Sequence, residues 1–591
     1  MSAHSLQPQR QRPDPRQEMI NRRVPLVVGF LIVISGLLLF AVSRYQWLPP
    51  DVQREFLLRG RQNASSIRRL PAERGIIYDS EGHPLAFNTI QYEVGVSPNL
   101  ITSDKRLDVA RQLGVILGRD EYELLQLISR PTQWQLVARP VSAQVGQAIA
   151  DLNILGVVIN PLQKRFYPQG ELMGQVIGFV IEDNNSTTRG AMGVEGSYNG
   201  TLAGRTLEEE VSSIPFTLPD RLRPTAQKGM DLVLTIDRDL QFWVEEELKR
   251  AVQENGATKG TILLMNPKNG DILAMASYPT FNPNEFTQIS DPSLLKNPAV
   301  SETYEPGSVM KVMTVAAALE MGVITPNWTY NDTGMLDVGG IQVLNWDRRA
   351  HGLVDTTTLL VDSLNVGAAT VALAMGPTEF YSRIRAFGFG VPTRVDLLGE
   401  ESGILRVPGD SDWSESNLAT NSYGQGMTVT PLQMLTAVNA IANDGLMMQP
   451  RIVRQIVDGE TVINAQTAAL GRVVSKQTAD AVTQMMVRVV EDENGVGAAR
   501  LQGYTIAGKT GTAQIPSPTG YETCNTCSIV TFVGFFPADD PQVSVLVKLD
   551  RSQGYWGSVV AAPVFRKLSE RLVILMGIPS DTVRANLQEG N

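Results

Sequence analysis

An uncharged apolar run near the N-terminus limits what this chain of 591 residues can fold into. Residues 24–43 contain no Asp, Glu, Lys or Arg. About 20 residues of α-helix, at about 1.5 Å each, cross the roughly 30 Å hydrocarbon core of a bilayer. We therefore predict a single transmembrane helix over residues 24–43. The alternative is a cleavable signal peptide, since Ala41-Val42-Ser43 resembles a cleavage site, but the run exceeds the usual signal-peptide core.

Arginine residues flank this run on both sides. Cytoplasmic flanks of membrane helices carry an excess of Lys and Arg, so the balance between the flanks predicts orientation. The arginines before and after the run are Arg10, Arg12, Arg16, Arg22 and Arg23, and Arg44, Arg54, Arg59 and Arg61, respectively. The totals are nearly equal, but the adjacent pair Arg22-Arg23 favours a cytoplasmic N-terminus. Residues 1–23 are then a cytoplasmic tail, and the chain after residue 43 lies outside the cytoplasm.

Composition excludes several classes of function. Hydrophobic residues make up 43% of the chain and charged residues 19%, which is typical of globular domains. A net charge of -10 argues against nucleic acid as a partner, because phosphate binding needs clustered Lys and Arg. The only histidines are His4, His83 and His351. A histidine-based triad and a zinc site are therefore both disfavoured, we expect no metal or other cofactor, and we interpret His351 as structural.

Two folded regions are expected after the helix. Residues 44–225 are mixed and polar, with Pro and Gly at intervals, and carry no catalytic signature. A second region begins near residue 226, where an alternating apolar strand over 231–237 precedes a helical pattern over 240–252. The sequence therefore predicts a domain boundary near residue 226.

Strand patterns occur at both ends of the second region. Residues 260–277 contain two strand-like segments around a turn, and residues 543–549 alternate between Val or Leu and other residues. A helical pattern follows over 558–576. We predict an α+β domain over 226–580, with an antiparallel sheet flanked by helices plus an all-helical part, and a tail over 581–591.

Three short strings carry the candidate chemistry. In chain order they are Ser308-Val309-Met310-Lys311, Ser363-Leu364-Asn365 and Lys509-Thr510-Gly511-Thr512. Ser308 follows the turn-forming pair Pro306-Gly307 and precedes an apolar helical pattern over 310–321. A spacing of three places Lys311 on the same helical face as Ser308, which suits a nucleophile and its base.

Each string is weak alone. Ser293-Leu294-Leu295-Lys296 is a second S-x-x-K between two prolines, where Lys296 is expected to be solvated, and Ser97-Pro98-Asn99 imitates S-x-N. The order of the three strings and their flanking residues therefore carry the assignment.

This order resembles that of penicillin-binding proteins and class A β-lactamases. Further resemblance favours class B penicillin-binding proteins, through Arg74-Gly75-Ile76-Ile77-Tyr78-Asp79, Gly193-Val194-Glu195-Gly196 and Tyr423-Gly424-Gln425-Gly426. The resemblance implies an elongated pedestal or dimerisation-type domain over 44–225 and a transpeptidase domain over 226–580. The paired glutamates of a class A glycosyltransferase module are not matched.

The resemblance also implies a role for each site residue. Ser308 would be the nucleophile, Lys311 the base, Ser363 a proton relay, and Asn365 would orient Lys311 and the substrate backbone. Lysine must be neutral to act as a base, through burial or a neighbouring cation such as Lys509. The expected substrate-carboxylate binding residues are Lys509, Thr510 and Thr512, with Gly511 letting the strand lie close to the substrate. The backbone N–H groups of Ser308 and Thr512 would form the oxyanion hole.

The implied function is peptidoglycan crosslinking by D,D-transpeptidation through a Ser308 acyl-enzyme formed from a D-Ala-D-Ala stem peptide. Implied partners are stem peptides, β-lactam antibiotics and a SEDS-type glycosyltransferase in the membrane. Glu305 and the residues around Ser363 lean slightly toward a division or spore-type role over elongation. Two alternatives stay open: a β-lactam-acylated sensor or non-catalytic scaffold, and a D,D-carboxypeptidase or β-lactamase that uses water as the acceptor.

One feature departs from the family pattern. Cys524 and Cys527 form a C-x-x-C just after the K-T-G segment, in a turn-rich insertion over 516–525. A disulfide between them is expected outside the cytoplasm. We hypothesise that the oxidation state of this cysteine pair affects the conformation of the loop beside the substrate groove.

Overall fold

The computed structural model describes residues 15–46, 65–70, 72–182, 188–212, 226–518 and 520–589. The chain divides into two compact units, one formed by residues 1–71 and 206–226 and the other by 72–205 and 227–591. The arginines at 10, 12, 54, 59 and 61, which entered the orientation argument, lie outside the described residues, as does His4.

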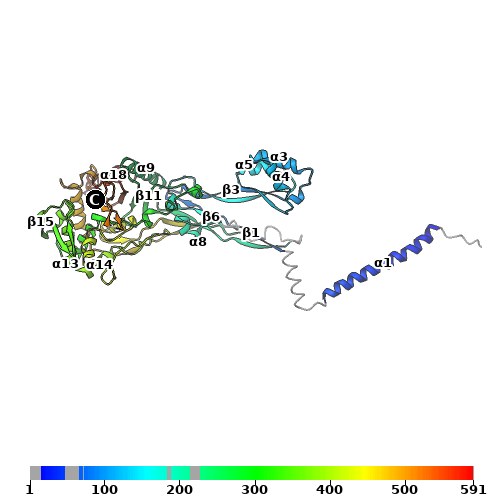
Figure 1. Cartoon of the computed structure of the whole chain (residues 1–591), viewed down its shortest axis with the longest axis horizontal. Helices are drawn as coiled ribbons and strands as arrows, with labels where there is room; N and C mark the ends of the chain where they lie inside the picture. The colour runs from blue at the N-terminus through cyan, green and yellow to red at the C-terminus, as the bar shows by residue number, and fades with distance from the viewer. Residues whose placement is uncertain are drawn as a thin grey trace, which may run out of the picture. The chain divides into compact units, whose positions relative to one another are not determined.

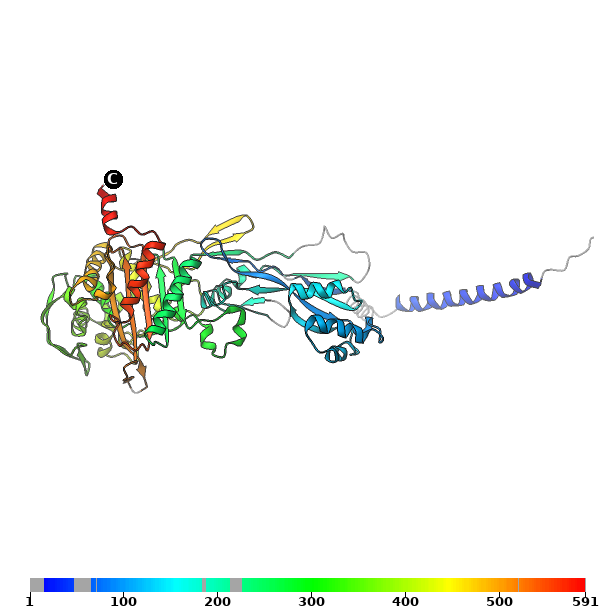
Figure 2. The ribbon, with the colours of Figure 1, turned by 90° about the horizontal axis from the view of Figure 1, so that it is seen from above.

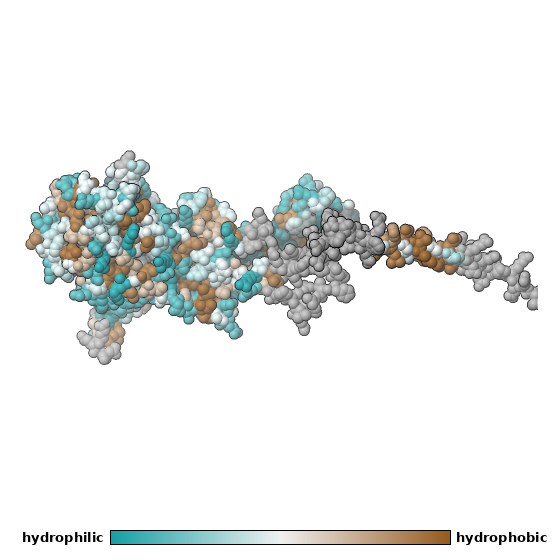
Figure 3. All heavy atoms as spheres, turned by 90° about the horizontal axis from the view of Figure 1, so that it is seen from below, coloured by the Kyte–Doolittle hydropathy of each residue, from teal (hydrophilic) through white to brown (hydrophobic). Residues whose placement is uncertain are grey.

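The first unit contains the predicted membrane segment. Helix α1 (Pro15–Gln46) includes Val24–Ser43, whose mean hydropathy is 2.8, and its visible face is hydrophobic in Figure 3. A helix satisfies its own backbone hydrogen bonds, which a bilayer core requires. The predicted helix is therefore confirmed, with a length and composition that suffice to cross a membrane. In the same unit, strand β1 (Ser65–Leu70) pairs antiparallel with β8 (Leu207–Ser212).

The second unit contains a mixed sheet that spans a large sequence distance. Its strands, in sheet order, are β18 (Thr461–Asn464), β17 (Val453–Asp458), β9 (Asp231–Leu234), β2 (Ile77–Tyr78), β3 (Pro84–Val96) and β4 (Gln135–Val141), with β5 (Val157–Phe166) also paired to β3. Strand β9, predicted from its alternation, lies between β2 and β17. The sheet thus includes strands from both sides of the boundary predicted at residue 226.

Three helices pack against one end of this sheet, as Figure 1 shows. They are α3 (Arg106–Leu117), α4 (Glu121–Ile128) and α5 (Ala143–Asp151). Val94 of β3, Leu113 and Leu124 of the helices, and Ile149 of α5 are buried together in a separate small core. Burial of these apolar side chains holds the helices to the sheet.

A buried ion cluster connects two motifs from the sequence. The Glu195 carboxylate accepts hydrogen bonds from Arg74 Nε at 2.6 Å and from Arg165 Nε at 2.6 Å. The side chains of Arg74 and Glu195 are 3% and 0% exposed, and that of Arg165 is 2% exposed. A buried ion pair between Arg74 and Glu195 therefore links the 74–79 and 193–196 segments. Arg165, which the sequence analysis did not identify, also pairs with Glu195.

The predicted antiparallel sheet is confirmed. Its strand order is β11 (Ile272–Tyr278), β10 (Lys259–Met265), β24 (Val543–Asp550), β23 (Ser528–Phe536) and β20 (Ala507–Gln514), and every neighbouring pair is antiparallel. Strands from the two ends of the region meet where β10 pairs with β24, so the helical middle of the chain is inserted between them.

Helices cover both faces of this sheet. Every residue of β24 is buried, which requires cover on each side. Helices α9 (Arg238–Glu254) and α18 (Ala561–Leu575) contact each other and one face, and Figure 2 shows α18 in red alongside the strands. Helix α16 (Pro431–Ala442) contacts β10, β23 and β24. Between β11 and β20 the chain forms mainly helices, with short hairpins such as β13 (Met335–Val338) with β14 (Ile341–Leu344).

Candidate active site

Ser308 lies at the start of a buried helix, as its sequence context predicts. A 3-10 turn, η5 (Gly307–Val309), leads directly into α11 (Met310–Glu320). Residues 310–318 of this helix are all buried, so the helix is fixed in the core. Gly307 has φ of +56°, and a Cβ there would stand 2.7 Å from Thr512 O. Glycine is therefore required for the serine turn to lie against β20.

Lys311 is completely buried and aimed at the serine. Its Nζ lies 2.9 Å from Ser308 Oγ, 2.6 Å from Ser363 O and 3.1 Å from Ser363 Oγ. Burial, and then the charge of Lys509, lower the pKa of Lys311 well below its usual value. A neutral amine has two N–H donors and one lone pair, so it can donate to the two Ser363 oxygens and accept from Ser308.

Ser363 is held in an uncommon backbone conformation. Its φ of +54° lies in the left-handed region, which is unfavourable for a residue with a Cβ. This conformation accompanies the short contact between its carbonyl oxygen and Lys311 Nζ. Its Oγ also accepts from Lys509 Nζ at 3.1 Å, so one hydroxyl lies between the two lysines.

Lys509 lies on β20 and is almost fully buried, at 1% exposure. Besides Ser363 Oγ, its Nζ donates to Thr510 O at 3.3 Å. Burial lowers the pKa of Lys509 to about 7. Both lysine amines are therefore desolvated and contact the Ser363 hydroxyl. Two positive charges close together in a desolvated site are costly, so protonation of one lysine disfavours protonation of the other.

A cavity of about 940 Å³ opens in front of these residues. β20 is the edge strand of its sheet, and an edge leaves one row of backbone groups for another chain. Five of the eight predicted site residues line the cavity: Ser308, Ser363, Asn365, Thr510 and Thr512. The arrangement offers a nucleophile, hydroxyls and a strand edge to an extended ligand.

Two details differ from the expectations. Lys311 is oriented by Ser363, whereas the Asn365 amide donates to Leu344 O at 2.9 Å. A Cβ on Gly511 would stand 2.9 Å from Pro306 O and 3.0 Å from Val309 Cγ2, so this glycine lets β20 pack against the serine turn. Spacing in the sequence does not show which side of a strand or helix faces which neighbour.

The sequence analysis did not identify some residues in and around the cavity and gave His351 only a structural role. The turn at 424–426 contacts the serine turn directly, since Gly307 N donates to Gly424 O at 3.1 Å. Trp556 and Gly557, which precede α18, line the cavity, and Gly557 N donates to Thr512 Oγ1 at 3.1 Å. His351 lines it too and lies 3.1 Å from Asp347 Oδ2. The loop before α18 has no sequence signal that would have identified it.

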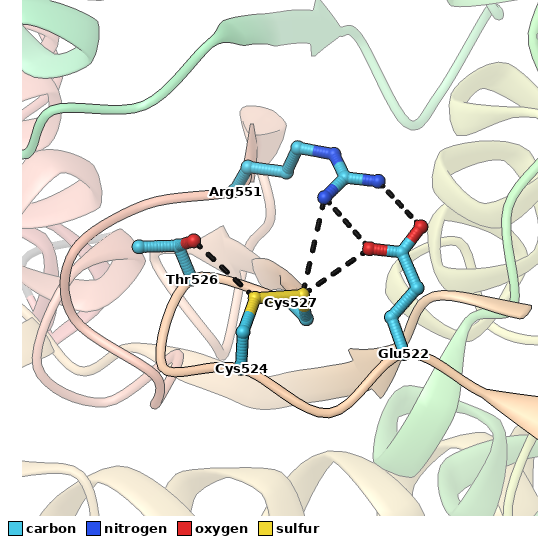
Figure 4. Close-up of a disulfide and its surroundings, with 5 residues drawn as sticks. All are labelled: Glu522, Cys524, Thr526, Cys527 and Arg551. Atoms are coloured by element: carbon cyan, nitrogen blue, oxygen red, sulfur yellow. Dashed lines mark hydrogen bonds and ion pairs between the residues drawn. A yellow bond between two sulfur atoms is a disulfide. The ribbon is translucent and has the colours of Figure 1, made fainter.

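The expected disulfide is confirmed. Cys524 and Cys527 are bonded, with Cα atoms 5.0 Å apart, in the loop between β20 and β23. Figure 4 shows the neighbouring ion pair, in which Arg551 binds both carboxylate oxygens of Glu522, at 2.8 and 2.7 Å. Lys296, which belongs to the second S-x-x-K string, is exposed, as expected for a solvated side chain.

Comparison with known families matches nearly the whole chain after the helix. The family described as penicillin binding protein transpeptidase domain matches residues 260–570. The family described as penicillin-binding protein dimerisation domain matches residues 69–214. Together they cover all eight predicted site residues and the strands of the mixed sheet other than β9.

Curated relatives match over most of their length. A probable peptidoglycan D,D-transpeptidase, PbpC of Pseudomonas aeruginosa, is 33% identical, covering 95% of this chain and 97% of the relative. Stage V sporulation protein D of Bacillus subtilis is 33% identical, covering 84% and 78%. Peptidoglycan D,D-transpeptidase FtsI of Escherichia coli is 29% identical, covering 98% and 96%.

Solved structures agree with this relationship. A peptidoglycan synthetase from Bifidobacterium adolescentis has a TM-score of 0.71 at 27% identity, covering 88% of this chain and 98% of its own. Penicillin binding protein 3 from Mycobacterium tuberculosis, complexed with aztreonam, has a TM-score of 0.67 at 28% identity, covering 87% and 98%. With its dimerisation and transpeptidase regions and its apolar N-terminal helix, the chain belongs to the class B penicillin-binding proteins.

Proposed function

We propose that Ser308 is the acylated nucleophile of a peptidoglycan D,D-transpeptidase that acts in cell-wall synthesis and is a target of β-lactams. The observation that carries this proposal is the buried Lys311 Nζ, 2.9 Å from Ser308 Oγ and anchored by Ser363. A lysine with a lowered pKa beside a serine hydroxyl is the arrangement that general-base activation needs.

Acylation follows from this geometry. Ser308 Oγ attacks the carbonyl carbon of the penultimate D-Ala while Lys311 takes its proton. A bond forms between Oγ and the carbon, the bond to the terminal D-Ala nitrogen breaks, and a proton passes to that nitrogen. Because Ser363 Oγ accepts from both lysines, its own hydrogen is available to the leaving nitrogen.

The other residues bind and polarise the substrate. Lys509, in its charged form, attracts the terminal carboxylate, and the hydroxyls of Thr510 and Thr512 line the cavity beside it. The backbone N–H groups of Ser308 and Thr512 are the proposed oxyanion donors, supported by the contact of Gly307 with Thr512. Asn365 lines the cavity and is proposed to bind the substrate backbone. Gly511 contributes by allowing β20 to approach the serine turn.

Transfer completes the reaction. An amine from a neighbouring stem attacks the acyl-enzyme carbonyl, the new C–N bond forms, the ester bond to Ser308 breaks, and the serine regains a proton. A cavity of about 940 Å³ beside the open edge of β20 is large enough for peptide on both sides of the serine. The site therefore has room for an amine acceptor carried on a second stem.

The cellular setting follows from the apolar helix. The protein is a single-pass membrane protein, and we place residues 1–23 in the cytoplasm and the catalytic region outside it. In the proposed organisation, residues 44–225 form a pedestal, 226–580 the transpeptidase domain and 581–591 a tail. A SEDS-type glycosyltransferase, which supplies new glycan strands, is the proposed membrane partner.

The test of this function separates transfer from hydrolysis. The full-length protein in detergent is incubated with uncrosslinked glycan strands that carry D-Ala-D-Ala stems, and released D-Ala and crosslinked stems are counted by mass spectrometry. Equal amounts of D-Ala and crosslinks are expected. Release of D-Ala with shortened, uncrosslinked stems would identify a carboxypeptidase, and no release would refute the enzyme function.

Lys509 is expected to set an alkaline limit on acylation. Its pKa of about 7 means that the free enzyme loses this positive charge as the pH rises through that value. The second-order rate constant for acylation by benzylpenicillin, which carries a carboxylate, should then fall about tenfold per pH unit above it. Lys311 acts in the opposite sense, since it must be neutral, and burial followed by the charge of Lys509 lowers its pKa well below the usual value.

Lys509→Arg is the matched variant for this pH profile. A guanidinium stays protonated throughout the accessible range, so the alkaline fall should disappear even if the overall rate is lower. The profile is measured by stopped-flow with wild type and variant in the same buffers. An identical alkaline fall in both would assign the titration to another group.

A further inference from the structure

Glu305 is a buried carboxylate that the mechanism above does not use. It is 5% exposed and lies three residues before Ser308. Its Oε1 accepts from Gly426 N at 2.9 Å, and Tyr521 OH lies 3.2 Å from Oε1 and 3.1 Å from Oε2. The two donors come from different loops, so one carboxylate joins three segments of the site.

The first of these segments is the turn at 424–426. Gly424 and Gly426 have φ of +80° and +72°, which favours glycine at both positions. Gly424 O accepts from Gly307 N at 3.1 Å, directly before the serine. Gln425 Nε2 lies 3.4 Å from Oε1 of Gln514, two residues beyond Thr512. The turn therefore contacts both segments that carry the proposed oxyanion donors.

The second segment is the loop between β20 and β23. Tyr521 belongs to the short hairpin of β21 (Pro516–Ser517) with β22 (Gly520–Tyr521). The residue after it, Glu522, is fixed by the paired bonds to Arg551 at the end of β24, and the disulfide closes the loop just before β23 (Figure 4). Cys527 Sγ lies 3.2 Å from Glu522 Oε2. Glu522 is thus held on the sheet side, while the neighbouring Tyr521 reaches the serine side through its hydroxyl.

We propose that Tyr521 is a positioning residue for acylation, whose hydroxyl bond to Glu305 holds the 520–527 segment against the 424–426 turn and so fixes the backbone of the Ser308 turn. This inference rests on the proposed function of Ser308. Burial raises the pKa of Glu305, and the hydrogen bonds from Gly426 N and Tyr521 oppose that rise, so both bonds favour the charged carboxylate. An ionised acceptor makes each of these hydrogen bonds stronger than a neutral pair.

The proposal predicts a change in rate and not in binding. In Tyr521→Phe, the ring remains and only the hydroxyl is lost. The first-order rate constant for acylation by a fluorescent penicillin should fall between about 5- and 50-fold, less than the roughly 10²- to 10³-fold cost of removing an oxyanion donor. The dissociation constant of the preceding complex should change by less than about twofold, because Tyr521 is not among the residues that line the cavity.

Tyr198→Phe is the matched control. Tyr198 OH lies 2.8 Å from Asp396 Oδ2, and this carboxylate also accepts backbone N–H groups from Ile452 and Val453. Like the bond of Tyr521 to Glu305, it joins a tyrosine hydroxyl to a carboxylate that also accepts from the backbone. Neither Tyr198 nor Asp396 lines the cavity. The control should acylate at the wild-type rate.

Three outcomes would overturn the proposal. They are an unchanged acylation rate constant in Tyr521→Phe, a loss confined to the dissociation constant, and an equal loss in Tyr198→Phe. A second measurement tests the connection through Glu305: in a Glu305→Ala background, Tyr521→Phe should have no further effect, and an undiminished effect there would also overturn it. Wild type that is not acylated at all would instead refute the function on which the proposal rests.

Discussion

Ser308→Ala should abolish covalent labelling by a fluorescent penicillin. The hydroxyl that Lys311 contacts at 2.9 Å is then missing, and among the described residues Lys311 has no other hydroxyl contact than Ser363. In comparable serine enzymes, loss of the nucleophile costs on the order of 10⁶ in rate, which is below detection in a gel assay. The full-length protein is incubated with the label, denatured and quantified by in-gel fluorescence.

Ser293→Ala supplies the matched control. Ser293 belongs to the other S-x-x-K string, but both Ser293 and Lys296 are exposed. This variant should label as wild type does. Retained labelling of Ser308→Ala would contradict the proposed mechanism, and loss of labelling in both variants would indicate damage to the fold, which a thermal melt would reveal.

The stability of the label carries further information. Without an acceptor amine, a transpeptidase should keep its penicilloyl ester for many minutes. Rapid loss of label from wild type, with penicilloic acid in solution, would favour the β-lactamase alternative. A stable label with no crosslinking activity in the substrate assay would favour the sensor or scaffold alternative.

Some features of this fold could be predicted from local pattern. The alternation of Val543, Val545, Val547 and Leu549 predicted β24, because one face of a strand repeats every two residues. The run rich in Ala, Met, Val and Leu after Ser308 predicted α11 by its composition and not by a repeat on one face. The site could be predicted because three strings in a fixed order are rarer than any one of them. In each case the information lies within a few neighbouring residues.

Other features depend on contacts between distant segments. The alternation in β9 showed that a strand forms, but not that it pairs with β2, about 155 residues earlier, across the predicted boundary. The φ of +54° at Ser363 and the bond of its carbonyl to Lys311 arise from packing of two helical segments. Gly511 was expected to let its strand lie close to the substrate, and the sequence does not show that it also lets β20 pack against Val309.

Glu195→Gln should strongly destabilise the second compact unit. Glu195 is 0% exposed, and its single negative charge lies between Arg74 and Arg165, each with an Nε contact of 2.6 Å. An amide keeps the shape of the side chain but leaves two guanidinium charges uncompensated in the interior. Breaking a buried pair in this way typically costs about 3 to 5 kcal/mol. Chemical denaturation followed by intrinsic fluorescence, with a thermal melt alongside, measures the loss.

An exposed ion pair and a double variant show whether buried charge is the cause. Lys567 and Glu254 are 3.3 Å apart with side chains 45% and 54% exposed, so Glu254→Gln should cost less than about 1 kcal/mol. Adding Arg165→Met to Glu195→Gln removes one uncompensated charge and should recover part of the lost stability, although it deletes a second polar partner. Further destabilisation in the double variant would mean that Arg165 stabilises through packing and its bond to Asn88, and the electrostatic account would be wrong. Recovery would show that the 74–79 and 193–196 segments are joined by electrostatic attraction, with both guanidinium groups tolerated in the interior because the Glu195 carboxylate lies between them.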